Sequence, residues 1–357
     1  MKERVVRYDI IRIVAILMVL ILHCSTKLVV ASADSGLVFQ SANILNGIGR
    51  AGVPLFLMLS GALLLDEKKT FDTKKFYKKS LLGITLLLLF WLLFYAAWRS
   101  FLLPQMGVNT GLPAPGFTEY LLKLPGFYPH LWYLFMLIGL YLAIPVLRLF
   151  VKKENKNYVL GFILVAALAQ FITKTAGLLT LHADYTIADF MNKFHLEYAT
   201  GYLPYLLLGW YLSQFPLKKS YRILLYLSGL AGVIFSIFAV SAYFPEIVNI
   251  HEYVMEPDTL PAMLYGAAVF TFLCELTKDR STKNSIIREL SLSSFGVYIV
   301  HVAILDILTD SILPFSGSWI DLPVVYILCL FLITYGLSLA IVLPLSRVPG
   351  VKKIFHY

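Results

Sequence analysis

The chain has 357 residues, of which 59% are hydrophobic and only 14% are charged, and its mean hydropathy is +0.77. Because a soluble domain carries about a quarter charged residues, this composition excludes an ordinary soluble fold. The formal net charge of +9 does not indicate a nucleic-acid partner, since the basic residues lie in short stretches between apolar runs.

Ten apolar segments follow one another along the chain. They cover residues 8–30, 38–65, 80–103, 130–150, 157–179, 199–215, 221–243, 259–277, 288–313 and 322–346. A helix needs about 20 mostly apolar residues to cross the ~30 Å hydrocarbon layer, where lipid cannot satisfy exposed backbone groups. We therefore expect an all-α integral membrane protein of about ten transmembrane helices, forming one domain over residues 1–357 with no appended soluble domain.

The loops between these segments alternate in charge. Residues 66–79 contain six lysines, whereas residues 244–258 contain four acidic residues and no Lys or Arg. Because cytoplasmic loops carry the excess of Lys and Arg, both termini are predicted to be cytoplasmic and residues 244–258 to lie outside. The three cysteines form no CxxC pair and the histidines are scattered, so we predict neither a disulfide framework nor a metal site.

Ionisable side chains inside a membrane span are costly, and each is therefore a candidate functional group. The first segment holds Asp9, Arg12 and His23. Arg12 and His23 are eleven residues apart, which is about three helical turns, so they share one face. Asp9 precedes Arg12 by three residues, a spacing that permits a salt bridge. The alternative is that Asp9 and Arg12 reach the membrane interface and that His23 bonds a neighbouring helix.

The second segment carries Arg50 near its middle, within the glycine- and proline-containing run 47–54. A helix broken at this depth is tolerated where it lines a cavity, and the start of its second half can bind an anion. Ser60 and Gly61 follow in the same segment. They serve either close helix packing or a direct role in the site.

Two later segments contain further candidates. His130, Trp132 and Tyr133 open the fourth segment, where aromatic residues are also typical of a membrane interface. Tyr298 and His301 lie one turn apart in the ninth segment, and His301 is expected near the middle of the bilayer. A histidine at this depth either serves the reaction or bonds a neighbouring helix.

The motifs in the first two segments resemble those of membrane-bound acyltransferase family 3. Arg12 followed by His23 is similar to the hallmark of the family's first helix, an arginine, ten residues and a histidine. Arg50 with Val-Pro-Leu-Phe at 53–56 and Ser60-Gly61 resembles its second-helix motif. This version of the motif looks most like the branch that acylates surface polysaccharides.

The later motifs extend the resemblance over essentially the whole chain. His-Leu-Trp-Tyr at 130–133 is similar to the fourth-helix motif of the family. The run 291–298 followed by His301 resembles its late Ser/Gly/Tyr…His motif. The four motifs occur in the family's order on the expected number of helices.

The resemblance implies an O-acyltransferase. Such an enzyme takes an acyl group, usually acetyl, from cytoplasmic acyl-CoA and places it on a hydroxyl of a cell-surface or lipid-linked glycan. The expected partners are the lipid bilayer, acetyl-CoA as acyl donor and the glycan acceptor. The expected location is the plasma membrane of a bacterial cell, crossed many times.

The candidate residues suit this reaction. Arg12 and Arg50 could clamp the CoA phosphates or orient the thioester, with Asp9 holding Arg12. His23 would be the general base, because an imidazole titrates near neutral pH. Tyr298 and His301 could donate to the developing oxyanion or orient the acceptor. Direct transfer and a covalent acyl-His23 intermediate both remain open.

Two other functions fit the same features. A transporter or exporter of a polar small molecule or glycan precursor also uses intramembrane Arg and His and a broken helix, although no paired broken helices occur in two halves of this sequence. A sensor or scaffold in a glycan-synthesis complex would tolerate changes at His23 or Arg12.

Overall fold

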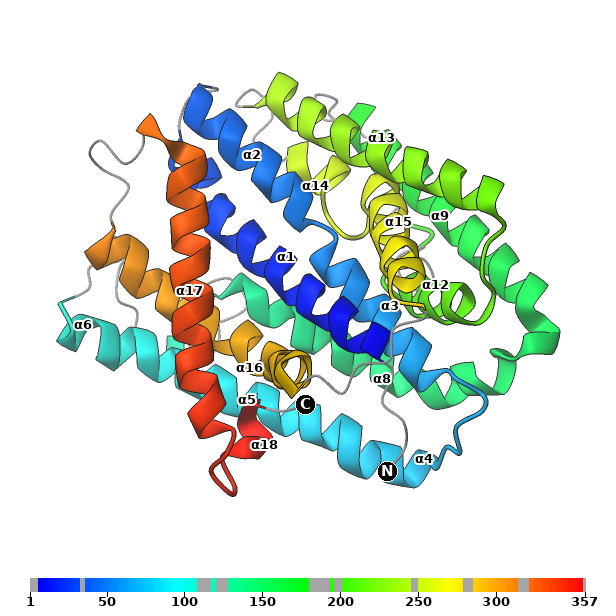
Figure 1. Ribbon diagram of the computed structural model, residues 1–357, viewed down its shortest axis with the longest axis horizontal. Helices are drawn as coiled ribbons and strands as arrows, with labels where there is room; N and C mark the ends of the chain where they lie inside the picture. Colours follow the sequence, from blue (N-terminus) through cyan, green and yellow to red (C-terminus); the bar gives the residue numbers. More distant parts are fainter. Residues whose placement is uncertain are drawn as a thin grey trace. The chain divides into compact units, whose positions relative to one another are not determined.

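The computed structural model describes residues 6–32, 36–107, 117–119, 128–179, 193–195, 201–244, 250–278, 285–313 and 321–355. The residues in these ranges form helices and no strand. The principal elements, drawn in Figure 1, are α1 (Val6–Ala31), α2 (Leu37–Gly49), α3 (Gly52–Leu64), α4 (Thr73–Phe76), η1 (Tyr77–Leu81), α5 (Leu82–Ala97), η2 (Trp98–Leu102), α6 (Leu103–Gln105), η3 (Pro129–Leu131), α8 (Trp132–Phe150), η4 (Lys153–Asn155), α9 (Lys156–Leu179), α12 (Leu203–Gln214), α13 (Lys219–Tyr243), α14 (Ile250–Val254), α15 (Leu260–Leu276), α16 (Ser285–Ile307), η5 (Leu308–Ile312), α17 (Pro323–Leu345) and α18 (Lys352–Phe355).

Eight helical stretches in the described part of the chain are long and apolar enough to cross a membrane. The other two predicted spans, 199–215 and 259–277, contain the shorter helices α12, with 12 residues, and α15, with 17. At 1.5 Å per residue these helices are about 18 and 26 Å long, less than the ~30 Å hydrocarbon layer. The predicted class, an all-α integral membrane protein, is confirmed, and each of the ten predicted segments contains a helix.

The chain divides into two compact units. The first unit consists of Met1–Lys69 and Val146–Ser291, and the second of Thr70–Pro145 and Leu292–Tyr357. Each unit is thus built from two separate stretches of sequence, and each is described by itself.

Close backbone approach holds α3 and α12 together in the first unit. A Cβ atom added to Gly61 of α3 would collide with the backbone of Leu206 in α12, and one added to Gly209 would collide with the backbone of Met58. Glycine is therefore required at both positions, and small residues of this kind let membrane helices pack at short distance. This packing explains Gly61 in the Ser60-Gly61 motif.

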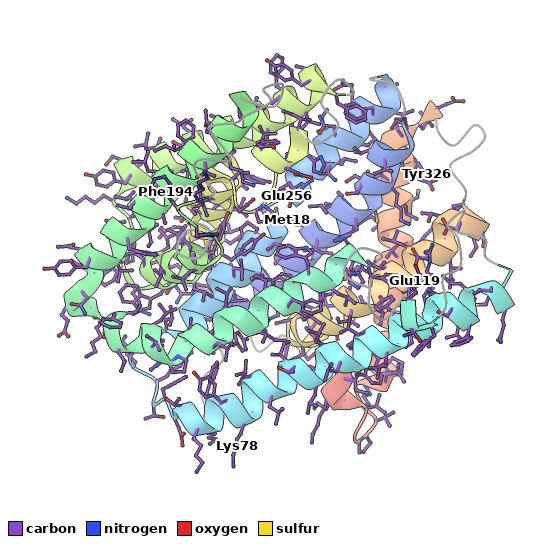
Figure 2. The ribbon with its side chains drawn as sticks, turned by 180° about the vertical axis from the view of Figure 1, so that it is seen from behind. Met18, Lys78, Glu119, Phe194, Glu256 and Tyr326 are labelled. Carbon is purple, nitrogen blue, oxygen red and sulfur yellow. The ribbon has the colours of Figure 1, made fainter. Side chains whose placement is uncertain are left out.

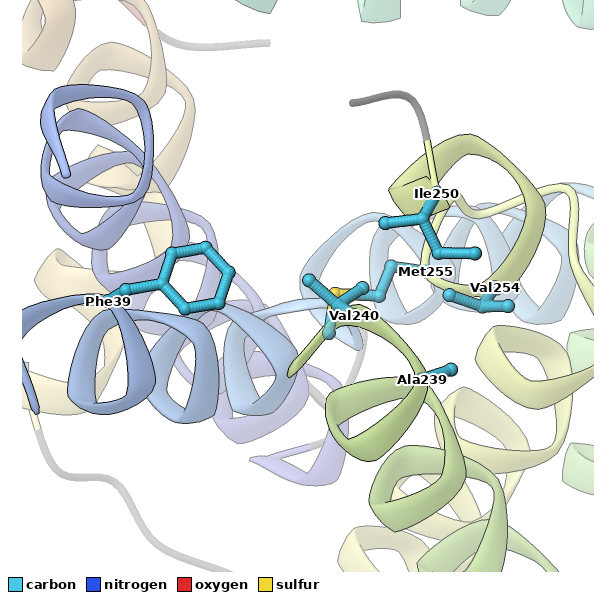
Figure 3. Packing of buried hydrophobic residues seen from close by; sticks show 6 residues of the cluster. All are labelled: Phe39, Ala239, Val240, Ile250, Val254 and Met255. Atoms are coloured by element: carbon cyan, nitrogen blue, oxygen red, sulfur yellow. The ribbon is translucent and has the colours of Figure 1, made fainter. Parts of the chain in front are cut away.

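An apolar cluster in the first unit joins α2, α13 and α14. Figure 3 shows its members, the buried residues Phe39, Ala239, Val240, Ile250, Val254 and Met255. The ring of Phe39 also stacks on Phe244, with centroids 4.4 Å apart and planes 11° from parallel. The short helix α14 is consequently fixed against α2 and α13 by buried apolar surface rather than lying loosely over them.

Aromatic side chains dominate the packing of the second unit. Trp91 of α5 meets Phe355 of α18 edge to face, with ring centroids 5.8 Å apart, and Phe76 of α4 meets Tyr141 of α8 at 5.5 Å. The unit also contains the π-helical turns η1, η2 and η5, and turns of this type often lie at functional sites. One of them, η2, carries the buried Arg99.

Candidate active site

In the first unit, three residues form a polar network near the N-terminal end of α1, the end that is predicted to face the cytoplasm. Arg12 Nη1 donates to Ser291 Oγ at 3.0 Å, and Ser291 Oγ donates to Asp9 Oδ1 at 2.7 Å. The ion pair that the spacing of Asp9 and Arg12 permitted is present at 3.9 Å. Asp9 and Ser291 are buried, whereas the Arg12 side chain is 27% exposed. Arg12 is therefore held firmly and still reaches the surface.

Arg50 lies at the break between two helices, as the glycine- and proline-containing run predicts. Helix α2 ends at Gly49 and α3 begins at Gly52. Both glycines lie against α1 so closely that a Cβ on Gly49 would meet Leu22 and a Cβ on Gly52 would meet Val19. The break is therefore set against the middle of α1, beside the turn that carries His23.

Two side chains hold the guanidinium of Arg50. Arg50 Nε donates to Asn46 Oδ1 at 3.0 Å, and Arg50 Nη1 donates to Glu256 Oε1 at 2.8 Å. Asn46 in turn donates to Thr26 Oγ1 at 2.8 Å and to the Leu22 carbonyl at 3.3 Å, which connects the arginine to α1. Figure 2 labels Glu256, in the turn that follows α14.

His23 is half-buried on α1 and its hydrogen bond defines its tautomer. His23 Nδ1 lies 2.8 Å from the carbonyl oxygen of Val19. A carbonyl can only accept, so this bond places the proton on Nδ1 and makes Nε2 the basic nitrogen. Arg50 follows Gly49, which packs on Leu22, the residue before His23. The first unit thus brings together His23 and Arg50, two of the residues that the sequence singled out.

The remaining candidates of the first unit lie apart from this pair. Arg12 is about 16 Å from His23 along the helix axis, as three turns require. Ser60 Oγ donates to the carbonyl of Phe56, one turn earlier in its own helix, at 2.9 Å. The contact found for Ser60 is therefore local, and it favours the packing interpretation of the Ser60-Gly61 motif.

The second unit buries a cluster of imidazole and phenol groups. Tyr298 donates its hydroxyl to the carbonyl of His130, and His301 Nδ1 lies 2.6 Å from the carbonyl of Tyr298. The rings of His130 and His301 meet edge to face with centroids 5.6 Å apart. All three side chains are buried. Trp132 is half-buried and meets Tyr133 edge to face at 6.3 Å, and Tyr133 in turn meets Tyr298 edge to face at 5.6 Å.

Four further residues extend the cluster, and none of them was among the predicted site residues. They are Tyr95, Arg99, Tyr128 and Asp306. Tyr95 donates to the Ile299 carbonyl at 2.5 Å, and its ring lies 4.3 Å from that of Tyr128. Tyr128 donates to Asp306 Oδ2 at 3.4 Å. Burial, and next the charge of Asp306, raise the pKa of Tyr128, while Arg99 acts in the opposite direction. Tyr128 is thus a neutral hydrogen-bond donor at physiological pH.

Sequence signals existed for some of these residues. Arg99 is an ionisable group inside the predicted segment 80–103, and such a group marks a candidate by itself. Glu256 is one of four acidic residues in 244–258, and a buried arginine needs a counter-charge. Spacing along the chain could not choose among those four acids.

The fold defines the protein as a multi-pass α-helical membrane protein, whose first unit places a histidine beside a paired arginine. Residues 5–343 match the family described as Acyltransferase domain, and the chain belongs to this family, membrane acyltransferase family 3. No curated protein matches the chain at a significant level, and no solved structure does so either. The protein is therefore an acyltransferase embedded in the lipid bilayer, with an acyl donor and an acyl acceptor.

Proposed function

We propose that the protein transfers an acetyl group from cytoplasmic acetyl-CoA to a hydroxyl of a cell-surface or lipid-linked glycan. Family membership supplies the class of reaction. The observation that supports this chemistry is the position of Arg50, at a helix break that packs on Leu22, the residue before His23, whose Nε2 is the basic nitrogen. An imidazole beside a hydrogen-bond donor is what activation of a hydroxyl and stabilisation of an oxyanion require.

Arg12 is the proposed contact for the CoA phosphates. It lies near the N-terminal end of α1, which the distribution of Lys and Arg predicts to be cytoplasmic. Its guanidinium is partly exposed, and a planar guanidinium matches phosphate geometry. Ser291 and Asp9 hold the arginine in place, so little side-chain entropy is lost when it binds the donor.

The reaction at His23 proceeds by proton transfer and acyl transfer. Nε2 of His23 removes the proton of the acceptor hydroxyl, and the oxygen attacks the thioester carbonyl carbon. The carbonyl oxygen acquires a negative charge, which Arg50 stabilises. The C–S bond then breaks, the CoA thiolate leaves, and His23 returns the proton to the thiolate. If Nε2 itself attacks first, the C–S bond breaks, CoA leaves as the thiolate and an acyl-His23 forms. The acceptor oxygen then attacks the acyl carbon, the C–N bond to Nε2 breaks, and the proton of the hydroxyl passes to the CoA thiolate.

The second unit is proposed to contribute two side chains to the reaction, as the sequence predicted. Of the two roles expected for them, Tyr298 and His301 are proposed to orient the acceptor. The hydroxyl of Tyr298 donates to the carbonyl of His130 and Nδ1 of His301 donates to the carbonyl of Tyr298, so donation to the oxyanion is left to Arg50. We also propose that both units belong to one acyltransferase domain. The family match supports this, because residues 5–343 include parts of both units.

Acetylation of surface glycan in a bacterial strain lacking the protein tests the proposal. The strain is complemented with the wild type or with His23→Ala, at matched amounts in the plasma membrane, and base-labile acetyl groups are measured on the glycan. We expect only the wild type to restore them. An unchanged glycan in all strains contradicts a glycan acceptor, and transport of a polar molecule without acyl-CoA consumption then becomes the better explanation.

A further inference from the structure

The segment 250–259 forms a strap in the first unit, consisting of α14 and the turn that leads into α15. Its sequence predicted only an outer loop, since it is acidic and lacks Lys and Arg. In the structure it carries Glu256 to the half-buried Arg50. The role of this strap rests on the function proposed above.

Apolar residues fix one side of the strap. Ile250, Val254 and Met255 are buried against Phe39 of α2 and Val240 of α13, as Figure 3 shows. Lifting the strap would expose these apolar side chains to water, so the strap does not separate readily from the helices beneath it.

Hydrogen bonds fix its backbone on either side of Glu256. Ser236 Oγ donates to the Val254 carbonyl at 2.5 Å, and Tyr205 donates to the Pro257 carbonyl. Thr259 Oγ1 donates to the carbonyl of Glu256 itself at 2.8 Å. Glu256 therefore sits on a short stretch of backbone that is held before, at and after its own position.

A second ion pair ties down the end of the strap. Lys174 of α9 lies 2.8 Å from Asp258 Oδ2 and also donates to the Glu252 carbonyl at 3.0 Å. The strap thus has two acidic contacts, Glu256 with Arg50 and Asp258 with Lys174. Only the contact between Glu256 and Arg50 involves a residue of the proposed reaction.

The two bonds to Arg50 leave one edge of its guanidinium available. Nε is bound by Asn46 and Nη1 by Glu256, whereas Nη2 makes no hydrogen bond to any residue in the described part of the chain. A guanidinium has five N–H donors in a fixed plane, so fixing two nitrogens also fixes the direction in which the third points. The side chain is 13% exposed, so a small part of it is open to a ligand.

Pairing with Glu256 also changes what Arg50 can bind. The carboxylate offsets the positive charge of the arginine at 2.8 Å, which weakens its attraction for a phosphate dianion. The directed N–H groups remain, and they suit an uncharged oxygen that gains negative charge during the reaction. Of the two roles that the sequence allowed for Arg50, this contact favours orientation of the thioester over the binding of phosphates.

We infer that Glu256 is a positioning residue, which holds Arg50 so that its Nη2 edge faces the thioester carbonyl of the donor. Glu256 acts through Arg50 and does not itself touch the reacting atoms. Loss of its charge leaves the arginine free to turn about its side-chain bonds. Since a misplacement of about 1 Å can cost ~100-fold in rate, the effect falls on kcat rather than on the KM for acetyl-CoA.

The experiment measures steady-state transfer from acetyl-CoA by the full-length protein in membranes that contain its native acceptor. Glu256→Gln is compared with Glu252→Gln, which removes the same charge from an exposed position of the same strap. Arg50→Lys and the double variant Arg50→Lys/Glu256→Gln complete a cycle. Thermal unfolding of each purified protein reports whether the fold is retained.

We expect Glu256→Gln to lower kcat about 10- to 100-fold, with the KM for acetyl-CoA changed less than about twofold. Glu252→Gln should behave as the wild type. Glu256→Gln should have little further effect once Arg50 is lysine, because residues that act as a unit are not additive. Glu256→Asp, which keeps the charge, should recover part of the rate.

Other outcomes separate the inference from the proposed function. Additive effects of Glu256→Gln and Arg50→Lys, or a change confined to KM, would overturn the positioning role while leaving acyl transfer intact. Equal losses of kcat in Glu256→Gln and Glu252→Gln would also overturn the positioning role. Absence of transfer by the wild type contradicts the proposed function, and the role of Glu256 falls with it.

Discussion

The polar groups of the first unit and those of the second unit are held in opposite ways. In the first, Arg12 and Arg50 are charged, paired with acidic or hydroxyl side chains, and partly exposed. In the second, Tyr298 and His301 are buried and bonded to backbone carbonyls. A group bonded to the backbone in the interior mainly fixes structure, whereas a charged group with an exposed edge can meet a ligand. We therefore expect chemistry to depend most on the first unit and stability most on the second.

The largest expected effect is that of His23→Ala on turnover. Loss of a general base costs about 10²- to 10⁴-fold, so acetyl-CoA consumption should fall by this factor. Because His23 is only half-buried and its Nδ1 bond is local to α1, the fold should persist. Release of CoA thiol by the purified protein with acceptor measures the rate.

His251→Ala is the matched control for this prediction, since His251 lies on α14 and is not among the proposed reactive residues. Its rate should equal that of the wild type. A His23→Ala protein with at least half of the wild-type rate would remove His23 from the reaction path.

Arg50→Lys should have the next largest effect, about 10²- to 10³-fold on kcat, which is the usual loss when an oxyanion donor is removed. Lysine keeps the charge but lacks Nε–H and the planar fork that Asn46 and Glu256 hold. Arg148→Lys is the comparison within the same unit. Arg148 donates to the carbonyls of Leu64, Asp66 and Lys69 and so secures the end of α3.

The two arginine variants should therefore separate an effect on turnover from an effect on thermal stability. Arg50→Lys lowers kcat with a small change in thermal stability, and Arg148→Lys lowers thermal stability with a small change in kcat. Transfer assays and thermal unfolding on the same preparations measure both. If both variants lost only stability, Arg50 would be a structural arginine as well.

Tyr298→Phe tests the second unit, and its main effect should be on stability. The change removes the hydroxyl that donates to the carbonyl of His130 and leaves that buried acceptor without this bond. The expected cost is about 1–3 kcal/mol, with less than about a tenfold loss of rate. Tyr335→Phe is the control, because its half-buried ring stacks on Phe331 and no hydrogen bond of its hydroxyl occurs within the described residues. A loss of rate comparable to that of His23→Ala, with unchanged unfolding, would instead place Tyr298 in the chemistry.

The smallest effect is expected for Ser60→Ala, within about twofold of the wild-type rate. Its hydroxyl bonds the carbonyl of Phe56 in its own helix, and such local bonds contribute little. Gly61→Ala, one residue further, should abolish accumulation of folded protein, because the new methyl group collides with the backbone of Leu206. Fluorescence-detected gel filtration distinguishes the two. A severe loss of activity in Ser60→Ala with normal folding would show that Ser60 serves the reaction directly.

Local sequence patterns sufficed for much of the fold and for part of the site. Apolar length located the ten longer helical stretches but not short helices such as α14, since the membrane imposes a fixed thickness only on the helices that cross it. The spacing of Asp9 and Arg12 indicated their ion pair, and the glycine- and proline-containing run located the break at Arg50. These features depend on residues within one or two turns of each other.

The rest of the site depends on contacts between distant parts of the sequence. Glu256 is 206 residues from Arg50, and Ser291 is 279 residues from Arg12. Helical periodicity says nothing about which segments pack together, so it could not select these partners. The predicted segment 259–277 agrees with α15 to one residue at each end, and the predicted end at 215 agrees with the end of α12 at Gln214.

The most direct test of the account uses inside-out membrane vesicles, which expose the cytoplasmic face to labelled acetyl-CoA. Vesicles with the wild-type protein should place base-labile acetyl groups on glycan, whereas vesicles with equal amounts of His23→Ala should not. Sealed right-side-out vesicles should give no label with either protein. Equal labelling by the wild type and His23→Ala would contradict the central claim that His23 carries the acyl transfer.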